Sequence, residues 1–244
     1  MFKDLKQLIS VNDKSDVYEK ISEFKRDEHY DLTIIVPVRG RGHFFMAIVN
    51  HLKGAISKTD KNINIVFVEH SDVSIHEGRC KQFDINYHWI EAKKTEKFNK
   101  CLAHNVGALL YQNSDYYMFH DLDCIMFDDF FTNLFENINS KNAKAIQTFQ
   151  GRRVLYLDNV LTKGILNETI QLKNVDIKST RVTAGDYGAP GGSIIVEKDL
   201  FFNVGGYDPE FFVGHSPEDA YFWDKLETLT KVHSADAPIN ELLH

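Results

Sequence analysis

The sequence predicts an α/β domain, because apolar β-branched segments alternate with amphipathic segments along its first half. The first strand is predicted over residues 32–37, where an apolar run too short for a helix is stopped by a proline. A helix is predicted over residues 44–56, where apolar residues recur every three to four positions. Strands separated by helices are typical of a parallel sheet, in which ligands bind beyond the carboxyl ends of the strands.

The alternation continues to about residue 127 and then becomes less regular. Further strands are predicted over residues 63–68, 85–90, 116–119, 143–149 and 192–196. Further helices are predicted over residues 98–111, 130–138, 198–204 and 217–229. Residues 151–190 carry mixed signals and support no assignment. Two short helices are expected near the N-terminus, so we predict a helical appendage over residues 1–30 and one larger domain over residues 31–244.

The composition narrows the class of protein. With 244 residues, 43% hydrophobic and 26% charged, the chain has enough apolar material for one globular core. Its formal net charge of −7 argues against a nucleic-acid partner. No apolar run approaches the ~20 residues that cross a bilayer, and a secretion signal is missing, so a soluble cytoplasmic protein is expected. The three scattered cysteines are expected to be buried thiols in a reducing compartment.

Two polar segments follow predicted strands and are candidates for ligand binding. Asp121 and Asp123 stand one residue apart after an aromatic strand, and a hard divalent cation is held by such oxygens together with phosphate oxygens. We favour this interpretation over a simple turn. Arg39 and Arg41 follow the first strand, and their guanidinium groups suit a diphosphate. A solvated basic turn is an equally good interpretation of the two arginines alone.

Two further segments lie in the second half. Four glycines permit close backbone approach to a ligand, although they form no dinucleotide-binding fingerprint and a plain loop is equally consistent: Gly185, Gly188, Gly191 and Gly192. Glu218 and Asp219 open a predicted helix, where the helix dipole favours ionised carboxylates. Such a carboxylate could accept a proton from a sugar hydroxyl, although helix capping is the simpler explanation of the position.

The order of these motifs resembles that of the GT-A glycosyltransferases, closest to the β-1,4-galactosyltransferase and chondroitin-polymerase-like group, over about residues 31–244. The matching segments, in chain order, are residues 34–41, 98–100 with 105–107, 119–123, 190–193 with 205–207, and 214–219. The resemblance implies a Rossmann-like nucleotide-diphospho-sugar transferase fold with a mixed, mainly parallel sheet flanked by helices. It also implies a polysaccharide-synthesising enzyme that moves a hexose or N-acetylhexosamine from a UDP-sugar to a saccharide hydroxyl, with inversion.

The resemblance also implies roles for individual residues. The residues expected to bind the uridine nucleotide or to lie beside the donor are Pro37, Val38, Arg39, Arg41, Phe98, Lys100, Asp121, Gly191 and Gly192. Asp123, with Asp121 and His244, would bind Mn²⁺ or Mg²⁺, and His233 is the alternative to His244. Asp219 would be the general base, and Glu218 would orient one of the sugars.

The chain departs from the family pattern at four positions. Val38 and Lys100 replace an aromatic residue and an arginine, and His215 replaces a tryptophan that packs on the acceptor. Ala189 replaces a tyrosine beside the donor, which suggests room for an N-acetyl group. A catalytically silent nucleotide-sugar or glycan-binding module is therefore the main alternative, and a nucleotidyltransferase is a weaker one. The expected partners are a nucleotide sugar and a saccharide acceptor, and peripheral membrane association is left open.

Overall fold

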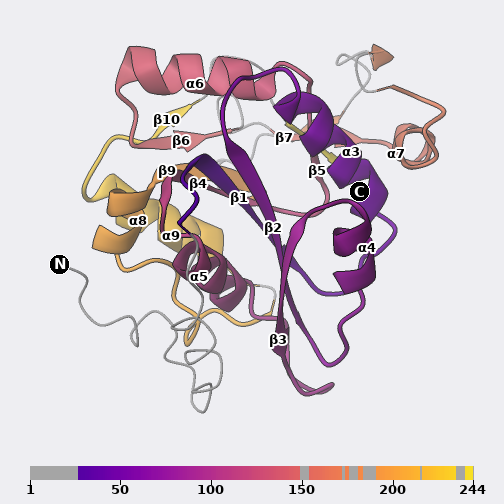
Figure 1. The fold of residues 1–244 in the computed structure, drawn as a ribbon, viewed down its shortest axis with the longest axis horizontal. Coiled ribbons are helices and arrows are strands. Elements are labelled where there is room, and N and C mark those ends of the chain that lie inside the picture. Colours follow the sequence, from indigo (N-terminus) through magenta and orange to yellow (C-terminus); the bar gives the residue numbers. More distant parts are fainter. Residues whose placement is uncertain are drawn as a thin grey trace.

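The computed structural model describes residues 27–148, 154–171, 174–175, 181–183, 191–214, 216–234 and 240–243 (Figure 1). The predicted N-terminal helices lie outside the described residues, as do His215, His244, Ala189, Gly185 and Gly188. Within the described ranges, no helix combines the length and the apolar character required to cross a membrane. The three cysteines are buried and free, as the sequence predicts.

The central element is a seven-stranded sheet with the order β10-β6-β9-β4-β1-β2-β3 (Figure 1). Its strands are β1 (Tyr30–Val38), β2 (Ile63–Ser71), β3 (Asn86–Glu91), β4 (Ser114–His120), β6 (Ala145–Gln147), β9 (Ser193–Glu197) and β10 (His233–Ser234). β1 is parallel to both β2 and β4, whereas β9 runs antiparallel to β4 and β6. The sheet is therefore mixed and mainly parallel, as the resemblance implies.

Helices cover both faces of this sheet. They are α3 (Phe45–Ile56), α4 (Glu77–Gln82), α5 (Lys100–Leu110), α6 (Phe130–Lys141), α8 (Lys198–Asn203) and α9 (Glu218–Glu227). Ile34 packs in a core with α3 and α6, whereas its neighbour Ile35 packs in a core with α5, α8 and α9. This alternation explains why the run over β1 is apolar throughout, since both faces of the strand are buried. Gly107 permits α5 to approach β1 closely, because a Cβ there would lie 2.5 Å from Ile35 Cγ2.

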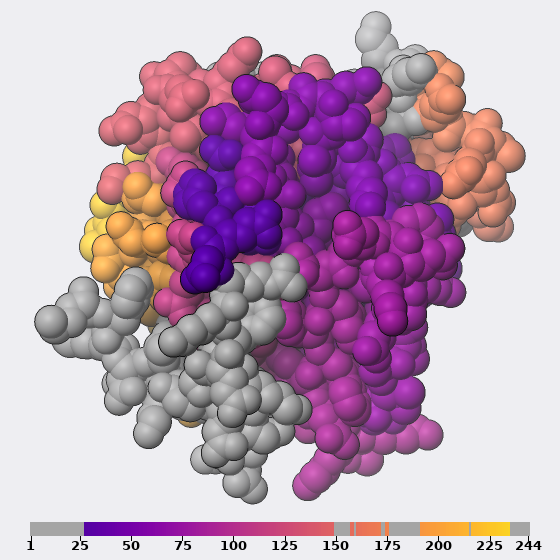
Figure 2. Space-filling view, in the orientation of Figure 1, coloured from indigo at the N-terminus to yellow at the C-terminus, as the bar shows by residue number. Residues whose placement is uncertain are grey.

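A second sheet, with the order β5-β11-β7-β8, is a feature that the sequence analysis missed. It contains β5 (Cys124–Met126), β11 (Asn240–Leu243), β7 (Val154–Leu157) and β8 (Arg181–Thr183), and α7 (Asn159–Leu166) follows β7. Figure 2 shows the α7 segment, in orange, at one edge of the molecule, where α7 packs near α3. These strands are too short for their side chains to show the alternating pattern of a strand in the sequence. Their pairing partners also lie far away along the chain.

The remaining predictions agree with the structure to within a few residues. The helices predicted over residues 98–111, 130–138 and 217–229 are α5, α6 and α9. The strand predicted over residues 143–149 is the shorter β6. α4 was not predicted, because its six residues bury one apolar side chain, that of Cys80. The parallel strands β1 and β4 end side by side, so the segments that follow them meet at one edge of the sheet.

Candidate active site

A cavity of about 320 Å³ lies where β1 and β4 end. Its lining includes eight residues singled out from the sequence together with two of their neighbours, Leu122 and Gly214: Pro37, Val38, Arg39, Arg41, Phe98, Lys100, Asp121 and Glu218. Segments more than 170 residues apart in the sequence thus meet at one place. Glu69, near the end of β2, lies outside this lining: its side chain is buried and accepts hydrogen bonds from the backbone N–H groups of Ile75 and His76.

The loop after β1 points two guanidinium groups in different directions. Gly40 and Arg41 have φ angles of +67° and +54°, so two successive residues adopt the left-handed conformation and turn the chain sharply. Arg39 Nη1 donates to the carbonyl oxygen of Glu96 at 2.5 Å. Arg41 Nη1 lies 2.6 Å from Asp123 Oδ2. A non-glycine residue in this conformation is strained, and strain of this kind collects at functional sites.

Lys100 is the charged centre of the site, because its ammonium group contacts three carboxylates. Lys100 Nζ lies 2.9 Å from Asp121 Oδ1, 2.8 Å from Asp219 Oδ2 and 3.6 Å from Glu218 Oε1. The lysine is the first residue of α5, and Asn99 fixes that position by accepting a hydrogen bond from Leu102 N at 2.8 Å. The family resemblance implies a nucleotide-binding role for Lys100, and no sequence pattern predicts these ion pairs.

Burial controls the protonation of this cluster. Burial raises the pKa of Asp219 to about 6, although the nearby Lys100 opposes the rise and Asp121 adds to it. Burial alone would lower the pKa of Lys100, but the surrounding carboxylates raise it well above its ordinary value. Asp219 is therefore ionised at neutral pH and binds a proton more readily than an exposed aspartate, which is what a general base requires.

Gly191 and Gly192 connect the start of β9 to the acidic residues. A Cβ at Gly191 would lie 2.5 Å from Asp219 Oδ2, so only glycine leaves room for that carboxylate. The carbonyl oxygen of Gly192, which has a φ angle of +85°, accepts a hydrogen bond from Asp121 N at 2.7 Å. The backbone at these two glycines therefore lies close to Asp219 and Asp121.

His120 fixes the end of β4 beneath the two aspartates. It is fully buried and is paired through Nδ1 with Ser193 Oγ at 3.0 Å and through Nε2 with the carbonyl oxygen of Cys124 at 3.1 Å. Burial lowers its pKa to about 4, so the imidazole is neutral. These bonds join β4 to β9 and hold the turn that carries Asp121 and Asp123.

The described residues do not make up a metal site by themselves. No group of three His, Cys, Asp or Glu side chains that could hold an ion occurs in the described part of the chain. His233 lies on β10, three strands from β4 in the sheet, or roughly 14 Å at the usual strand spacing. In contrast, Leu242 of β11 pairs with Cys124, so the register brings Leu243 level with Asp123. His244 follows Leu243 and lies outside the described residues.

Comparisons with known proteins identify the family. The model of the family described as "Glycosyltransferase like family 2" matches residues 33–242. The chain belongs to this family. It is a glycosyltransferase, and the match covers both the cavity at the end of β1 and the acids of α9. The comparison with curated proteins gave no match.

Solved structures of glycosyltransferases share the fold of this protein. The catalytic domain of Drosophila β1,4-galactosyltransferase 7 in complex with xylobiose is 16% identical with a TM-score of 0.57, over 88% of this chain and 71% of that one. S. aureus TarS 1–349 is 14% identical with a TM-score of 0.60, over 87% of this chain and 60% of that one. Its complex with UDP-GlcNAc is 13% identical with a TM-score of 0.56, over 88% and 58% of the two chains. The GT-A fold and the resemblance to the galactosyltransferase group are confirmed.

Proposed function

We propose that this glycosyltransferase moves a hexose or N-acetylhexosamine from a UDP-sugar to a saccharide hydroxyl, with a divalent cation and with inversion at the anomeric carbon. The observation that carries the proposal is the convergence of Asp121, Glu218 and Asp219 on Lys100, beside a cavity that also receives Arg39 and Arg41. A cavity with paired acids and three cationic groups suits a diphosphate whose charge changes during the reaction.

The donor would bind with its diphosphate near the arginines. Arg39 and Arg41 present planar guanidinium groups to the cavity, and Phe98 offers an aromatic surface to the uracil. Asp121 and Asp123 are hard oxygen ligands at one strand end, which fits Mn²⁺ or Mg²⁺ bound through two carboxylates and the phosphates. The cation would supply charge neutralisation on the UDP leaving group. His244 would add a third protein ligand, and the pairing of β11 with β5 supports this assignment.

The chemical step follows from the position and basicity of Asp219. The acceptor oxygen attacks the anomeric carbon, and its proton passes to a carboxylate oxygen of Asp219. The bond between the anomeric carbon and the UDP oxygen breaks, and the electron pair stays on the β-phosphate. Glu218 accepts a hydrogen bond from Ser216 Oγ at 2.9 Å and is nearly buried, so it is positioned to orient a sugar hydroxyl.

The structural neighbours support the substrate class. One is described as a Drosophila β1,4-galactosyltransferase 7 mutant in complex with manganese, UDP-Gal and xylobiose. Another is TarS in complex with UDP-GlcNAc. A galactose donor and an N-acetylglucosamine donor thus occur on the same fold, which is why both classes of sugar are included in the proposal.

The test is a thermal-shift screen of UDP, UDP-Gal, UDP-GlcNAc and GDP-mannose, with Mn²⁺ and after chelation. A ligand that binds the folded state raises its apparent stability by mass action. We expect shifts for the uridine compounds that depend on the metal and are lost in Asp123→Asn. Asp115→Asn is the matched control, because Asp115 is an exposed aspartate that pairs with His29. Equal shifts after chelation, or none with any uridine compound, would contradict the proposal.

Turnover separates an enzyme from a silent binding module. Release of UDP from the stabilising UDP-sugar should occur in the presence of a saccharide acceptor and should stop in Asp219→Asn. Metal-dependent binding without any release of UDP, across uncharged mono- and oligosaccharide acceptors, would favour the silent module instead.

A further inference from the structure

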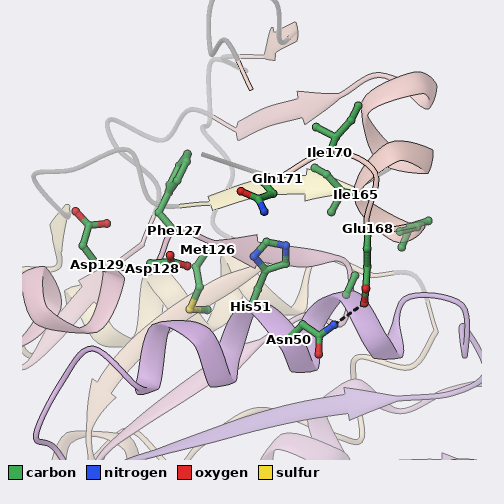
Figure 3. Close-up of a pocket in the computed structure, with 12 residues that line it drawn as sticks. Asn50, His51, Met126, Phe127, Asp128, Asp129, Ile165, Glu168, Ile170 and Gln171 are labelled. Carbon is green, nitrogen blue, oxygen red and sulfur yellow. Dashed lines mark hydrogen bonds between the residues drawn. The ribbon is translucent and has the colours of Figure 1, made fainter. Parts of the chain in front are cut away.

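A second cavity, larger than the first, lies between α3 and the turn after α7 (Figure 3). Its volume is about 600 Å³, within the range of small-molecule sites. Its polar lining comes from α3, from the segment after β5 and from the turn after α7: Asn50, His51, Asp128, Asp129, Glu168 and Gln171. Among the described residues, it shares no lining residue with the candidate active site. We call it the His51 cavity.

The centre of the His51 cavity is a neutral imidazole. Figure 3 shows the His51 ring rising from α3 into the cavity, below Gln171 and beside Met126. Burial lowers the pKa of His51, although Asp128 and the backbone of Met126 oppose the change. A neutral imidazole donates from one ring nitrogen and accepts at the other. Because the backbone of Met126 engages the N–H of the ring, the other ring nitrogen is left as an acceptor for a ligand hydroxyl.

The charge of the lining excludes anionic ligands. Asp128, Asp129 and Glu168 contribute three carboxylates, and the lining contains no lysine or arginine among the residues described. A phosphate, a nucleotide or a uronic acid would meet like charges without any counter-charge. The carboxylates are acceptors, so they suit a ligand that carries O–H or N–H donors.

The remaining lining is apolar, and it complements the polar groups. Met126, Phe127, Ile165 and Ile170 line the same cavity. A hydrocarbon chain would cover these side chains but would remove the amides and carboxylates from water without replacing their hydrogen bonds. A pyranose ring presents hydroxyls at its rim and C–H groups on its faces, so it satisfies both kinds of lining.

Glu168 gives the rim of the cavity a fixed shape. It has a φ angle of +58°, at the end of α7, where glycine usually stands. Its carboxylate accepts a hydrogen bond from Asn50 Nδ2 at 2.9 Å, shown as the dashed line in Figure 3. The strained conformation thus joins the turn after α7 to α3 across the cavity, which preforms the site.

We propose that the His51 cavity is a second saccharide-binding site that takes one uncharged sugar unit. Only the three residues of β5 separate Asp123 from Phe127, or about 13 Å of extended chain. The cavity is therefore close enough to the candidate active site to hold a unit of the acceptor chain away from the point of transfer. That last assignment rests on the proposed function, whereas sugar binding itself does not.

The test is a titration of the full chain with uncharged sugars, followed by NMR. The probes are the methyl glycosides of glucose, galactose and N-acetylglucosamine, with xylobiose, and the signal is the His51 ring Cε1–H resonance, assigned by its loss in His51→Leu. We expect at least one of these sugars to shift the resonance, and Asp128→Ala to weaken binding about tenfold or more. His51→Leu lacks this resonance, so its sugar binding is measured by ligand-detected saturation transfer. We expect binding to be weakened there to the same extent. His29→Leu and Asp115→Ala are matched controls on an exposed ion pair and should bind as the wild type does.

Several results would overturn the inference. They are no binding by any uncharged sugar, equal binding in His51→Leu, or a preference for glucuronate, protonated glucosamine or an alkyl chain. Circular dichroism on each variant shows whether it is folded, and Asp128→Ala and His51→Leu give two independent readings of the same cavity. The metal-dependent UDP shift is measured on the same samples. Sugar binding without a UDP shift contradicts only the proposed function, and a UDP shift without sugar binding at His51 contradicts only this inference.

Discussion

The two cavities lie at opposite ends of β5 and differ in charge more than in size. The first combines Arg39, Arg41 and Lys100 with Asp121 and Glu218, so its charges are largely balanced by ion pairs within the protein. The His51 cavity has carboxylates, amides and a neutral imidazole. The ion pairs of the first cavity can exchange partners when a charged ligand binds or leaves. The lining of the His51 cavity instead favours the hydroxyl groups of an uncharged ligand. This difference in lining is the reason why two ligands of different chemistry are proposed for the two cavities.

The two cavities are also built differently. The first is formed by segments that follow parallel strands and are fixed by hydrogen bonds such as that from Asp121 N to Gly192 O. The second is formed by one face of α3 and the turn after α7, which Glu168 joins to α3. Strand ends give a more rigid framework than a turn, as catalytic geometry requires.

The largest effect is expected for Asp219→Asn, which removes the proposed base and keeps the shape of the side chain. General base catalysis contributes about 10²–10⁴ in rate, so kcat should fall by that factor. Metal-dependent UDP binding, measured by thermal shift, should stay near the wild-type value. Asp224→Asn is the control, because Asp224 lies on the exposed face of the same helix. Full activity in Asp219→Asn would remove Asp219 from the role.

The next largest effect is expected for Gly191→Ala. The added Cβ would lie 2.5 Å from Asp219 Oδ2 and would displace the carboxylate. Misplacement of a catalytic group by about 1 Å can cost about 10²-fold, so we expect a loss of that order in kcat. Gly78→Ala is the control, because a Cβ there meets nothing within 4 Å. Equal kcat values for the two variants would show that Asp219 does not act from its position in the structure.

The main sheet could be predicted from the sequence because its signals are local. The apolar run at β1 reflects burial on both faces, and the turns after β1 and β4 carry the charged residues. The order of the motifs then indicated the family and brought Arg39, Asp121 and Asp219 into one candidate site. The structure places these residues around one cavity and one lysine, while their roles in binding and catalysis remain proposals.

The second sheet and the His51 cavity could not be predicted, because their contacts are distant in the sequence. β5 has three residues, and its partner β11 follows more than 110 residues later. His51, Met126 and Gln171 come from three separate elements and carry no shared motif. The role of Lys100 was missed for a related reason, since its pairing with Asp219 depends on how α5 and α9 pack rather than on spacing.

For Lys100→Gln, the pH dependence of kcat at saturating donor is the diagnostic measurement, because Lys100 also belongs to the cationic lining of the first cavity. Lys100 lowers the pKa of Asp219, which burial raises to about 6, so its removal should raise that pKa further. A base must be deprotonated, so the acid limb of the kcat profile should move to higher pH by about 1–3 units. The rates are measured at saturating donor, with Lys144→Gln as a control on an exposed ion pair. An acid limb that stays in place or moves to lower pH would contradict the ion-pair role.

The smallest effect is expected for Asp158→Ala, which acts on the wall of the His51 cavity. Asp158 caps α7, and its Oδ1 accepts hydrogen bonds from Val160 N and Leu161 N, both at 2.8 Å. Loss of such a cap costs about 1 kcal/mol, which urea denaturation can measure, and Asp158→Ser should restore most of it. Because α7 lines only the second cavity in the described part of the chain, metal-dependent UDP binding should not change. A parallel loss of UDP binding would show that the two cavities are coupled, and the distinction drawn between them would then have to be abandoned.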